Sequence, residues 1–259
     1  MTLPPLSNWD STRQTLHQAA QIAGAIRSAL VPPLPNYAHL ALYVTPDGLT
    51  TGDLNGEGTL DLDFRQRTLI YTCPAGNVST VPLAGHTQAT LTDALLTAMD
   101  AAGHPASPKR EKLTGTTPLD ADARLSADYA DALHSIYSAI ARYRARLLGG
   151  MSPLVVWPHG FDLSFLWFAR GFEERSDPHL NMGFSPGSPG LPRPYVYVYA
   201  YPAPPGMFDV QLPADARWNR EPWSGIVIDY DQLAAQDGHE ARLEADLQAI
   251  YAALAPLLK

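Results

Sequence analysis

The distribution of proline and glycine constrains this chain more than any other sequence feature. Its 259 residues include 24 prolines and 19 glycines, the two residue types that most strongly interrupt helices and strands. They separate short strand-like runs, but they leave four longer windows of helical periodicity nearly free of interruption. We therefore expect a few helices among many short strands joined by tight turns.

In each of the four windows, apolar residues recur at steps of three and four, which places them on one face of a helix. The expected helices cover Asp10–Leu30, Thr87–Ala102, Ser126–Leu148 and His239–Leu257. Asp10 is expected to cap the first helix, and Pro32-Pro33 to end it. Asp237 and Glu240 resemble a capping box at the start of the last helix.

Short runs with β-branched or aromatic residues and turn signals at their ends lie between these windows and indicate strands. The expected strands are Ala38–Val44, Leu60–Phe64, Thr68–Cys73, Val78–Leu83, Leu154–Trp157, Phe161–Phe168, Tyr195–Tyr201 and Gly225–Tyr230. Most of the first four runs are joined by short connections, which favour an antiparallel meander. The fold class predicted is α+β, with mainly antiparallel sheet flanked by about four helices.

A local match suggests that the chain consists of two similar halves. Val44–Leu49 and Val156–Phe161 share the pattern V-x-P-x-G followed by a large apolar residue. The alternative is that two Pro-Gly turns have the same chemistry without a common origin. We expect a single compact unit over residues 1–259, with half-repeats at 8–104 and 122–259. Inserted loops are expected near 172–194 and 202–222.

Charge and cysteine content exclude several classes of protein. The chain has 18 basic and 26 acidic residues, a formal net charge of −8, and no basic run, so binding to nucleic acid is not expected. No uncharged apolar run reaches 18 residues, which argues against a membrane span. Cys73 is the single cysteine, so no internal disulfide can form. With no secretory signal at the start of the sequence, these features predict a soluble, cytoplasmic protein.

Known catalytic motifs are missing from the sequence or lack their structural context. No P-loop, strand-linked G-x-G-x-x-G or H-E-x-x-H pattern occurs, and neither a cofactor nor a metal ion is predicted. Residues 183–187 read G-F-S-P-G, which matches the G-x-S-x-G pattern of serine hydrolases. Pro186 has no backbone N–H for an oxyanion hole, and the prolines that follow cannot begin a helix. We interpret this stretch as a loop.

Two groups of side chains are candidates for ligand binding. His17 and Gln21 lie four residues apart on the first helix, with Arg27 nearly two turns beyond Gln21. They form either a polar wall of a pocket or hydrogen bonds to backbone groups where the helix meets the sheet. Tyrosines alternate over Tyr195–Tyr201. This row forms either a stacking surface for a ligand or a half-buried sheet face with its hydroxyls at the rim.

Several segments resemble a bacterial family catalogued as a domain of unknown function. The most specific is W-D-S-T-R-Q-T-L-H at 9–17, followed by Q-I-A-G at 21–24 and G-L-T-T at 48–51. Shorter matches include Phe161-Asp162-Leu163 and the later Tyr199-Ala200-Tyr201-Pro202. Two features depart from the family pattern: Ala25 stands where a lysine is usual, and W-F-A-R-G at 167–171 replaces R-F-S-G-R. The second change argues against an anion site built from arginines.

The resemblance supplies no activity, but it implies which polar residues recur in the family. These residues are His17, Gln21, Arg27, His39 and Asp162. Together with Trp157 they form our candidate ligand-binding set, in a pocket between the first helix, the His39 strand and the Phe161-Asp162 segment.

Three functions stay open from the sequence. The first is binding of a small molecule in the pocket just described. The second is an enzyme in which His17 or His39 acts as general base and Asp162 orients it. The third is a protein-interaction module that uses the proline- and tryptophan-rich segment 202–223.

Overall fold

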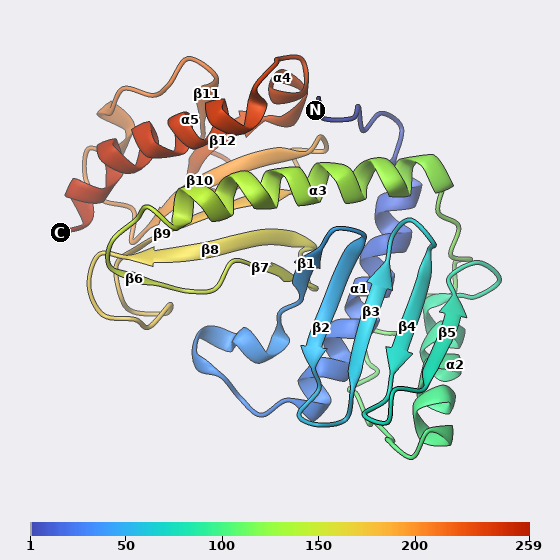
Figure 1. Cartoon of the computed structure of the whole chain (residues 1–259). Coiled ribbons are helices and arrows are strands. Elements are labelled where there is room, and N and C mark those ends of the chain that lie inside the picture. The colour runs from blue at the N-terminus through green and yellow to red at the C-terminus, as the bar shows by residue number, and fades with distance from the viewer. Residues whose placement is uncertain (1) are drawn as a thin grey trace. The chain divides into compact units, whose positions relative to one another are not determined.

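The computed structural model describes residues 2–259 and shows an α+β fold with two antiparallel sheets (Figure 1). The chain divides into two compact units. The N-terminal unit comprises Leu6–His134 and Val156–Phe161. The C-terminal unit comprises Ser135–Val155 and Asp162–Lys259, together with the N-terminal residues up to Pro5. The expected single unit and the half-repeats 8–104 and 122–259 stay predictions.

The N-terminal unit is built on a five-stranded meander with the strand order β1-β2-β3-β4-β5. Its elements are α1 (Asp10–Leu30), η1 (Pro35–Leu40), β1 (Tyr43–Thr45), β2 (Gly48–Asp53), β3 (Thr59–Asp63), β4 (Thr68–Thr72), β5 (Val78–Pro82) and α2 (Gln88–Ala101). Alternate residues of β3 and β4 are buried, as one-sided packing requires. Leu62 and Leu69 pair across these strands on the buried face, while Asp61 opposite Ile70 lies on the more exposed face.

The C-terminal unit contains a larger sheet, in which six strands follow the order β11-β12-β10-β9-β8-β6. These strands are β6 (Gly150–Met151), β8 (Asp162–Phe168), β9 (His179–Ser185), β10 (Tyr195–Tyr201), β11 (Ala216–Asn219) and β12 (Gly225–Asp229). The other elements are η2 (Met207–Asp209), α4 (Tyr230–Ala234), α5 (His239–Leu254) and η3 (Ala255–Leu258). The long helix α3 (Ala123–Arg144) and the short strand β7 (Val155–Trp157) each include residues of both units.

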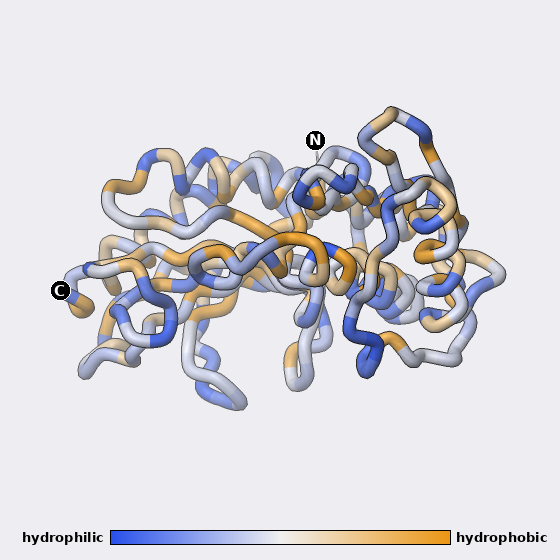
Figure 2. Tube along the Cα trace, turned by 90° about the horizontal axis from the view of Figure 1, so that it is seen from below, coloured by the Kyte–Doolittle hydropathy of each residue, from blue (hydrophilic) through white to orange (hydrophobic). Residues whose placement is uncertain are grey.

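Helices cover one face of the larger sheet. The ring of Trp167 on β8 meets Tyr251 of α5 edge-on at 4.9 Å, and the Arg144 guanidinium of α3 lies over the Phe165 ring at 5.8 Å. The side chains on this face are almost wholly apolar, and on β9 they are the fully buried Leu180, Met182 and Phe184. Figure 2 shows strongly hydrophilic stretches on several protruding loops and hydrophobic stretches between them along the chain.

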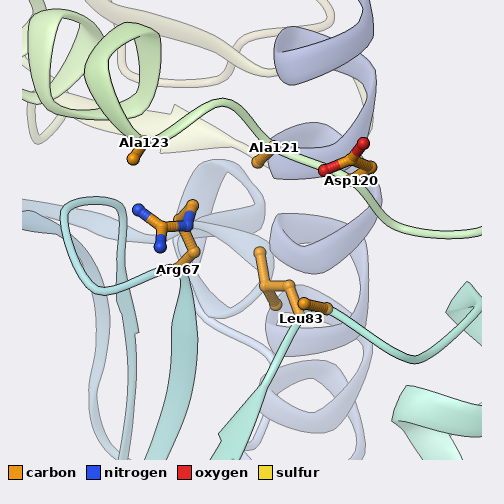
Figure 3. A pocket seen from close by; sticks show the side chains of 6 residues that line it. Arg67, Leu83, Asp120, Ala121 and Ala123 are labelled. Carbon is orange, nitrogen blue, oxygen red and sulfur yellow. The ribbon is translucent and has the colours of Figure 1, made fainter.

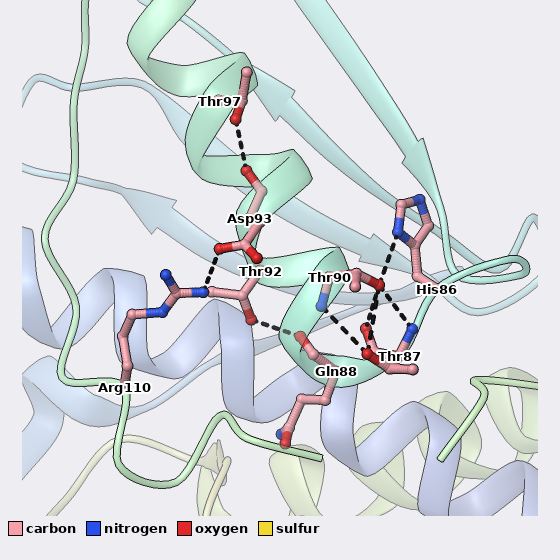
Figure 4. A network of polar contacts seen from close by, with 8 residues as sticks. All are labelled: His86, Thr87, Gln88, Thr90, Thr92, Asp93, Thr97 and Arg110. Atoms are coloured by element: carbon pink, nitrogen blue, oxygen red, sulfur yellow. Dashed lines mark hydrogen bonds and ion pairs between the residues drawn. The ribbon is translucent and has the colours of Figure 1, made fainter. Parts of the chain in front are cut away.

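The four long helices were predicted correctly in kind and place, but the N-terminal caps expected for the first and the last were not. The residue before α1 is Trp9, and Asp10 belongs to its first turn. Gly238, in a left-handed conformation, precedes α5, so Asp237 is not its cap. Thr87 forms a capping box with Thr90 at the start of α2, within a network of short-range contacts (Figure 4). These contacts satisfy backbone groups at the end of that helix.

The strand predicted over Ala38–Val44 is wrong in its first part. Residues up to Leu40 form η1, and β1 begins only at Tyr43. The Ala41 backbone N–H donates to the Ala38 carbonyl oxygen at 3.3 Å, a bond of a 3-10 turn in place of one to a neighbouring strand. The proposed His39 strand is therefore a turn of 3-10 helix.

The segment expected as an inserted loop near 172–194 contains a central strand. Residues His179–Ser185 form β9, which pairs along its length with both β8 and β10. The loop interpretation of 183–187 is thus wrong for Gly183–Ser185 and holds only from Pro186 onward. Likewise, β11 lies within the expected loop near 202–222. Among the described residues, no helix combines the length and the apolar character needed to cross a membrane.

Candidate functional site

The six predicted site residues are divided between the two units. His17, Gln21, Arg27, His39 and Trp157 belong to the N-terminal unit, whereas Asp162 belongs to the C-terminal unit. The two groups are therefore described separately.

His17 is engaged with the turn that contains Pro158. Its Nε2 lies 2.9 Å from the Pro158 carbonyl oxygen, and its ring stacks on Phe161 at 5.3 Å. Because a carbonyl only accepts, Nε2 carries the proton and donates. Burial lowers the pKa of His17 despite the backbone hydrogen bonds that oppose it. The ring is thus neutral near pH 7 and serves to attach the turn to α1.

Gln21 links α1 to α2. Its Oε1 accepts a 2.9 Å hydrogen bond from Gln88 Nε2. Gln88 Oε1 in turn accepts from the Gly115 backbone N–H at 3.1 Å. The sequence left open whether His17 and Gln21 line a pocket or bond to the structure around them, and this geometry favours the structural role.

Arg27 is buried at the end of α1, where only 3% of its surface is exposed. Its guanidinium donates to the carbonyl oxygens of Thr51 and Asp53 on β2 and to the Tyr43 hydroxyl. A cation at a helix C-terminus also interacts favourably with the helix dipole. Arg27 therefore joins α1 to the first sheet.

His39 and Trp157 have local contacts. The Leu34 backbone N–H donates to His39 Nδ1 at 3.2 Å, which leaves Nε2 as the protonated nitrogen. The Trp157 ring lies 6.4 Å from that of His159 in the same turn. His17 and His39 thus each use a ring nitrogen on the backbone, which disfavours either as a general base.

Asp162 begins β8 in the C-terminal unit and lies beside a row of polar and aromatic residues. Strand register places Ser164, Gly183 and Tyr197 next to one another across β8, β9 and β10. In the neighbouring row, Asn181 pairs with Tyr199. These side chains alternate with those under the helices, so they occupy the opposite face of the sheet. We call Asp162, Ser164, Asn181, Tyr197, Tyr199 and Trp223 the tyrosine face.

A short hydrogen bond fixes Asp162 on this face. The Tyr197 hydroxyl donates to Asp162 Oδ2 at 2.5 Å. Burial, followed by the charge of Asp162 and this hydrogen bond, raises the pKa of Tyr197 well above its usual value, and the Ser164 hydroxyl opposes the effect. Tyr197 is therefore a proton donor to the carboxylate, not a phenolate.

The absence of a side chain at Gly183 makes room for the Tyr197 ring. A Cβ at this position would lie 2.7 Å from the Tyr197 hydroxyl oxygen and 2.2 Å from the Leu163 carbonyl oxygen. Because such distances are too short for any side chain, glycine is required where the phenol crosses β9.

Asn181 has an unpaired oxygen on the same face. Its Nδ2 donates to the Tyr199 hydroxyl at 2.8 Å, whereas its Oδ1 is buried and has no hydrogen-bond partner. Only 8% of the residue is exposed. An unpaired buried polar atom costs about 1–3 kcal/mol, and such atoms are uncommon in native structures. The oxygen is thus a position at which a bound donor would be favourable.

Trp223 packs over the tyrosine row from the loop before β12. Its ring centre lies 6.2 Å from those of Tyr195 and Tyr197 and 6.4 Å from that of Tyr199. Asn219 Nδ2 donates to the Trp223 carbonyl oxygen at 2.6 Å, which fixes the loop. Trp223 and Tyr199 are both only half-buried, so the edge of this face reaches solvent.

Other aromatic residues of segment 202–223 pack on one another. The rings of Phe208 and Trp218 meet edge-on at 4.9 Å, and the Arg220 guanidinium lies 4.0 Å from the centre of the Phe208 ring. These contacts order the segment from within.

The N-terminal unit has a small open pocket of about 200 Å³ (Figure 3). It is lined by Arg67, Leu83, Ala84, Asp120, Ala121 and Ala123. Asp120, Ala84 and Ala123 are exposed, so the pocket is a surface depression. Within residues 2–259, no group of three or more His, Cys, Asp or Glu side chains is placed to hold a metal ion.

The sequence identified Asp162 and the tyrosine alternation but missed their partners. Ser164 was expected in a strand, but nothing in its pattern distinguished it from other strand residues. Asn181 and Gly183 lie on a strand that the G-x-S-x-G match and nearby prolines concealed. The alternation of polar and apolar residues over 179–185 is the signal that would have revealed this strand.

The fold and these contacts define a two-sheet α+β protein whose larger sheet has one apolar and one polar face. The chain belongs to the family of unknown function DUF5996, whose model matches residues 2–259. Searches among curated proteins and among solved structures find no match to this chain.

Proposed function

We propose that this protein binds a small molecule on the tyrosine face of its C-terminal unit. The observation that carries the proposal is the buried, unpaired Oδ1 of Asn181 beside the ordered Asp162–Tyr197 pair. A ligand with a hydrogen-bond donor would satisfy this oxygen, and the half-buried Tyr199 and Trp223 rings would contact its apolar part.

Two features favour binding over catalysis. Tyr197 holds Asp162 through a short hydrogen bond, which makes the carboxylate a fixed acceptor. His17 and His39, the bases of the enzyme hypothesis, are both bonded to backbone groups. The enzyme hypothesis and the interaction module at 202–223 stay predictions, as does the pocket first expected beside α1.

The proposed setting is the cytoplasm of a bacterium. Cys73 is a free, buried thiol, and a chain with one such cysteine is suited to a reducing compartment.

A thermal-shift screen of polar metabolites tests the proposal. Wild-type protein should be stabilised by at least one compound, and Asn181→Leu and Trp223→Ala should each reduce that shift. His39→Ala and Gln21→Ala, in the N-terminal unit, serve as matched controls and should leave the shift unchanged. Hits that depend on His39 or Gln21 but not on Asn181 would contradict the proposal and favour the pocket beside α1.

A further inference from the structure

The tyrosine face is rich in hydrogen-bond acceptors. Asn181 Oδ1 is buried and unpaired, and its amide nitrogen is already used on the Tyr199 hydroxyl. The Asp162 carboxylate is held on the same face by Tyr197. A ligand that completes this arrangement must donate hydrogen bonds.

The charges that act on this face are negative. Asp162 acts on both Tyr197 and Tyr199, and Glu174 acts on Tyr199 as well. Each carboxylate raises the pKa of the phenol it acts on, so each contributes a negative potential there. This potential disfavours a bound anion and favours a bound cation.

The aromatic rings add a third element to the same edge. Trp223 meets Tyr197 and Tyr199 edge-on, with interplanar angles of 68° and 60°. The electron-rich faces of such rings attract organic cations. The unpaired acceptor, the negative charges and the aromatic rings thus all favour the same kind of ligand, an organic cation that donates hydrogen bonds.

Resting on the proposed function, we infer that the ligand of the tyrosine face carries a primary ammonium group. The ammonium donates one hydrogen bond to Asn181 Oδ1 and is attracted by Asp162 and Glu174. The carbon chain of the ligand lies against Tyr199 and Trp223. The inference concerns this ligand class and excludes carboxylates and phosphates.

Three fragments of matched size test the ligand class: butylammonium, butan-1-ol and butanoate, each titrated at millimolar concentration with detection by protein NMR. Butylammonium should shift the Asn181 side-chain amide signal and should bind at least about tenfold more tightly than the other two, as expected for a charge near carboxylates. Raising the salt concentration should weaken its binding.

Variants with the same change in charge separate the local effect from that of net charge. Asn181→Asp should tighten butylammonium binding about tenfold, whereas Asn77→Asp, in an exposed turn of the N-terminal unit, should not change it. Glu174 lies outside the strands, so Glu174→Gln provides a second test if Asn181→Asp does not fold. Glu174→Gln should weaken butylammonium binding several-fold.

The outcomes separate the inference from the proposed function. If butan-1-ol binds at Asn181 as tightly as butylammonium, the inference of an ammonium ligand is wrong, but the proposed binding face is retained. If butanoate binds more tightly than butylammonium, the Asn181 amide N–H groups and not its oxygen face the ligand. This result would also contradict the inference of an ammonium ligand. If no fragment and no library compound shifts the Asn181 signal, both the inference and the proposed function fail.

Discussion

Asp162 and Tyr197 show how a single contact organises the polar face of the larger sheet. The 2.5 Å hydrogen bond from the Tyr197 phenol to the Asp162 carboxylate is charge-assisted, and such a bond is stronger than one between neutral groups. Asp162 stands on β8 and Tyr197 on β10, and Gly183 lies on β9 between these strands, where any side chain would displace the Tyr197 ring. The position of Asp162 therefore depends on residues from three strands.

Replacing Asp162 by Asn should change both titration and stability. The pKa of Tyr197 should fall, because the charge that raises it is removed. The free energy of unfolding should decrease by about 1.5–3 kcal/mol, the usual contribution of a hydrogen bond to a charged group. Ultraviolet titration of the tyrosines and urea denaturation measure the two effects. Asp63→Asn, at the end of β3 in the N-terminal unit, is the control. An unchanged tyrosine titration in Asp162→Asn would contradict the account.

His17 should make stability depend on pH. Its pKa is lowered in the folded protein, chiefly by burial and also by Arg13 and His159, so the unfolded chain binds the proton more readily. Stability should therefore fall as the pH drops through and below about 6.5, with a slope of at most about 1.4 kcal/mol per pH unit.

The variant His17→Gln separates this effect from those of the other histidines. Glutamine can still donate to the Pro158 carbonyl but does not titrate. Urea denaturation at pH 7.5 and pH 5.5 should show a smaller loss of stability in this variant than in wild-type protein. The same difference in His86→Gln, chosen as a control on another element, would show that His17 is not the source.

At the scale of elements, Gly24 stands where helix propensity alone would favour alanine but tertiary packing requires glycine. Alanine would favour the helix by about 1 kcal/mol. A Cβ on Gly24, however, would lie 2.4 Å from Pro158 Cγ, where the 156–161 turn packs against α1. The close approach that His17 secures is possible only because residue 24 has no side chain.

Gly24→Ala should therefore destabilise the protein by about 1–3 kcal/mol, the usual cost of overpacking. Thermal and urea denaturation provide the measurement. Combining it with Pro158→Gly, which removes the clashing atoms, should recover part of the loss. A Gly24→Ala variant more stable than wild type would show that the turn does not pack as described.

The elements also show what the sequence could predict. The long helices and the strands β3, β4 and β5 follow from periodicity, because their burial repeats regularly along the chain. β2 was not predicted, because its burial does not alternate regularly and its pairing with β3 shifts in register between Thr50 and Asp53. β9 was missed because Pro186 and Gly187 suggested a loop, although they only end the strand. Ala38–Leu40 was mistaken for strand because it continues into the apolar run that leads to β1, and its residue types do not reveal the 3-10 turn. For the candidate site, Asp162 could be named from the sequence, but its partners depend on strand register.

Hydrogen exchange tests the position of β9 in the sheet. Its amides bond to two neighbouring strands, so peptides covering His179–Ser185 should exchange slowly. Peptides from the following loop, residues 186–194, should exchange much faster. Similar fast rates in both segments would contradict the central place of β9.

At the scale of the whole molecule, each unit has its own sheet, and the candidate residues named from the sequence occur in both units. The contacts of His17, Gln21 and Arg27 hold α1 to its surroundings, which accounts for their presence without a ligand. The contacts of Asp162 leave an unpaired acceptor nearby. This difference places the proposed binding function in the C-terminal unit.

The most direct test of that assignment observes the Asn181 side-chain amide by NMR while compounds stabilising the protein in the thermal-shift screen are added. The account predicts a concentration-dependent shift of this signal, because a donor bound to Oδ1 changes the electron distribution of the whole amide. The side-chain amide of Asn77, in an exposed turn of the N-terminal unit, should keep its position. Stabilising compounds that leave the Asn181 signal unchanged and shift signals of α1 would contradict the account.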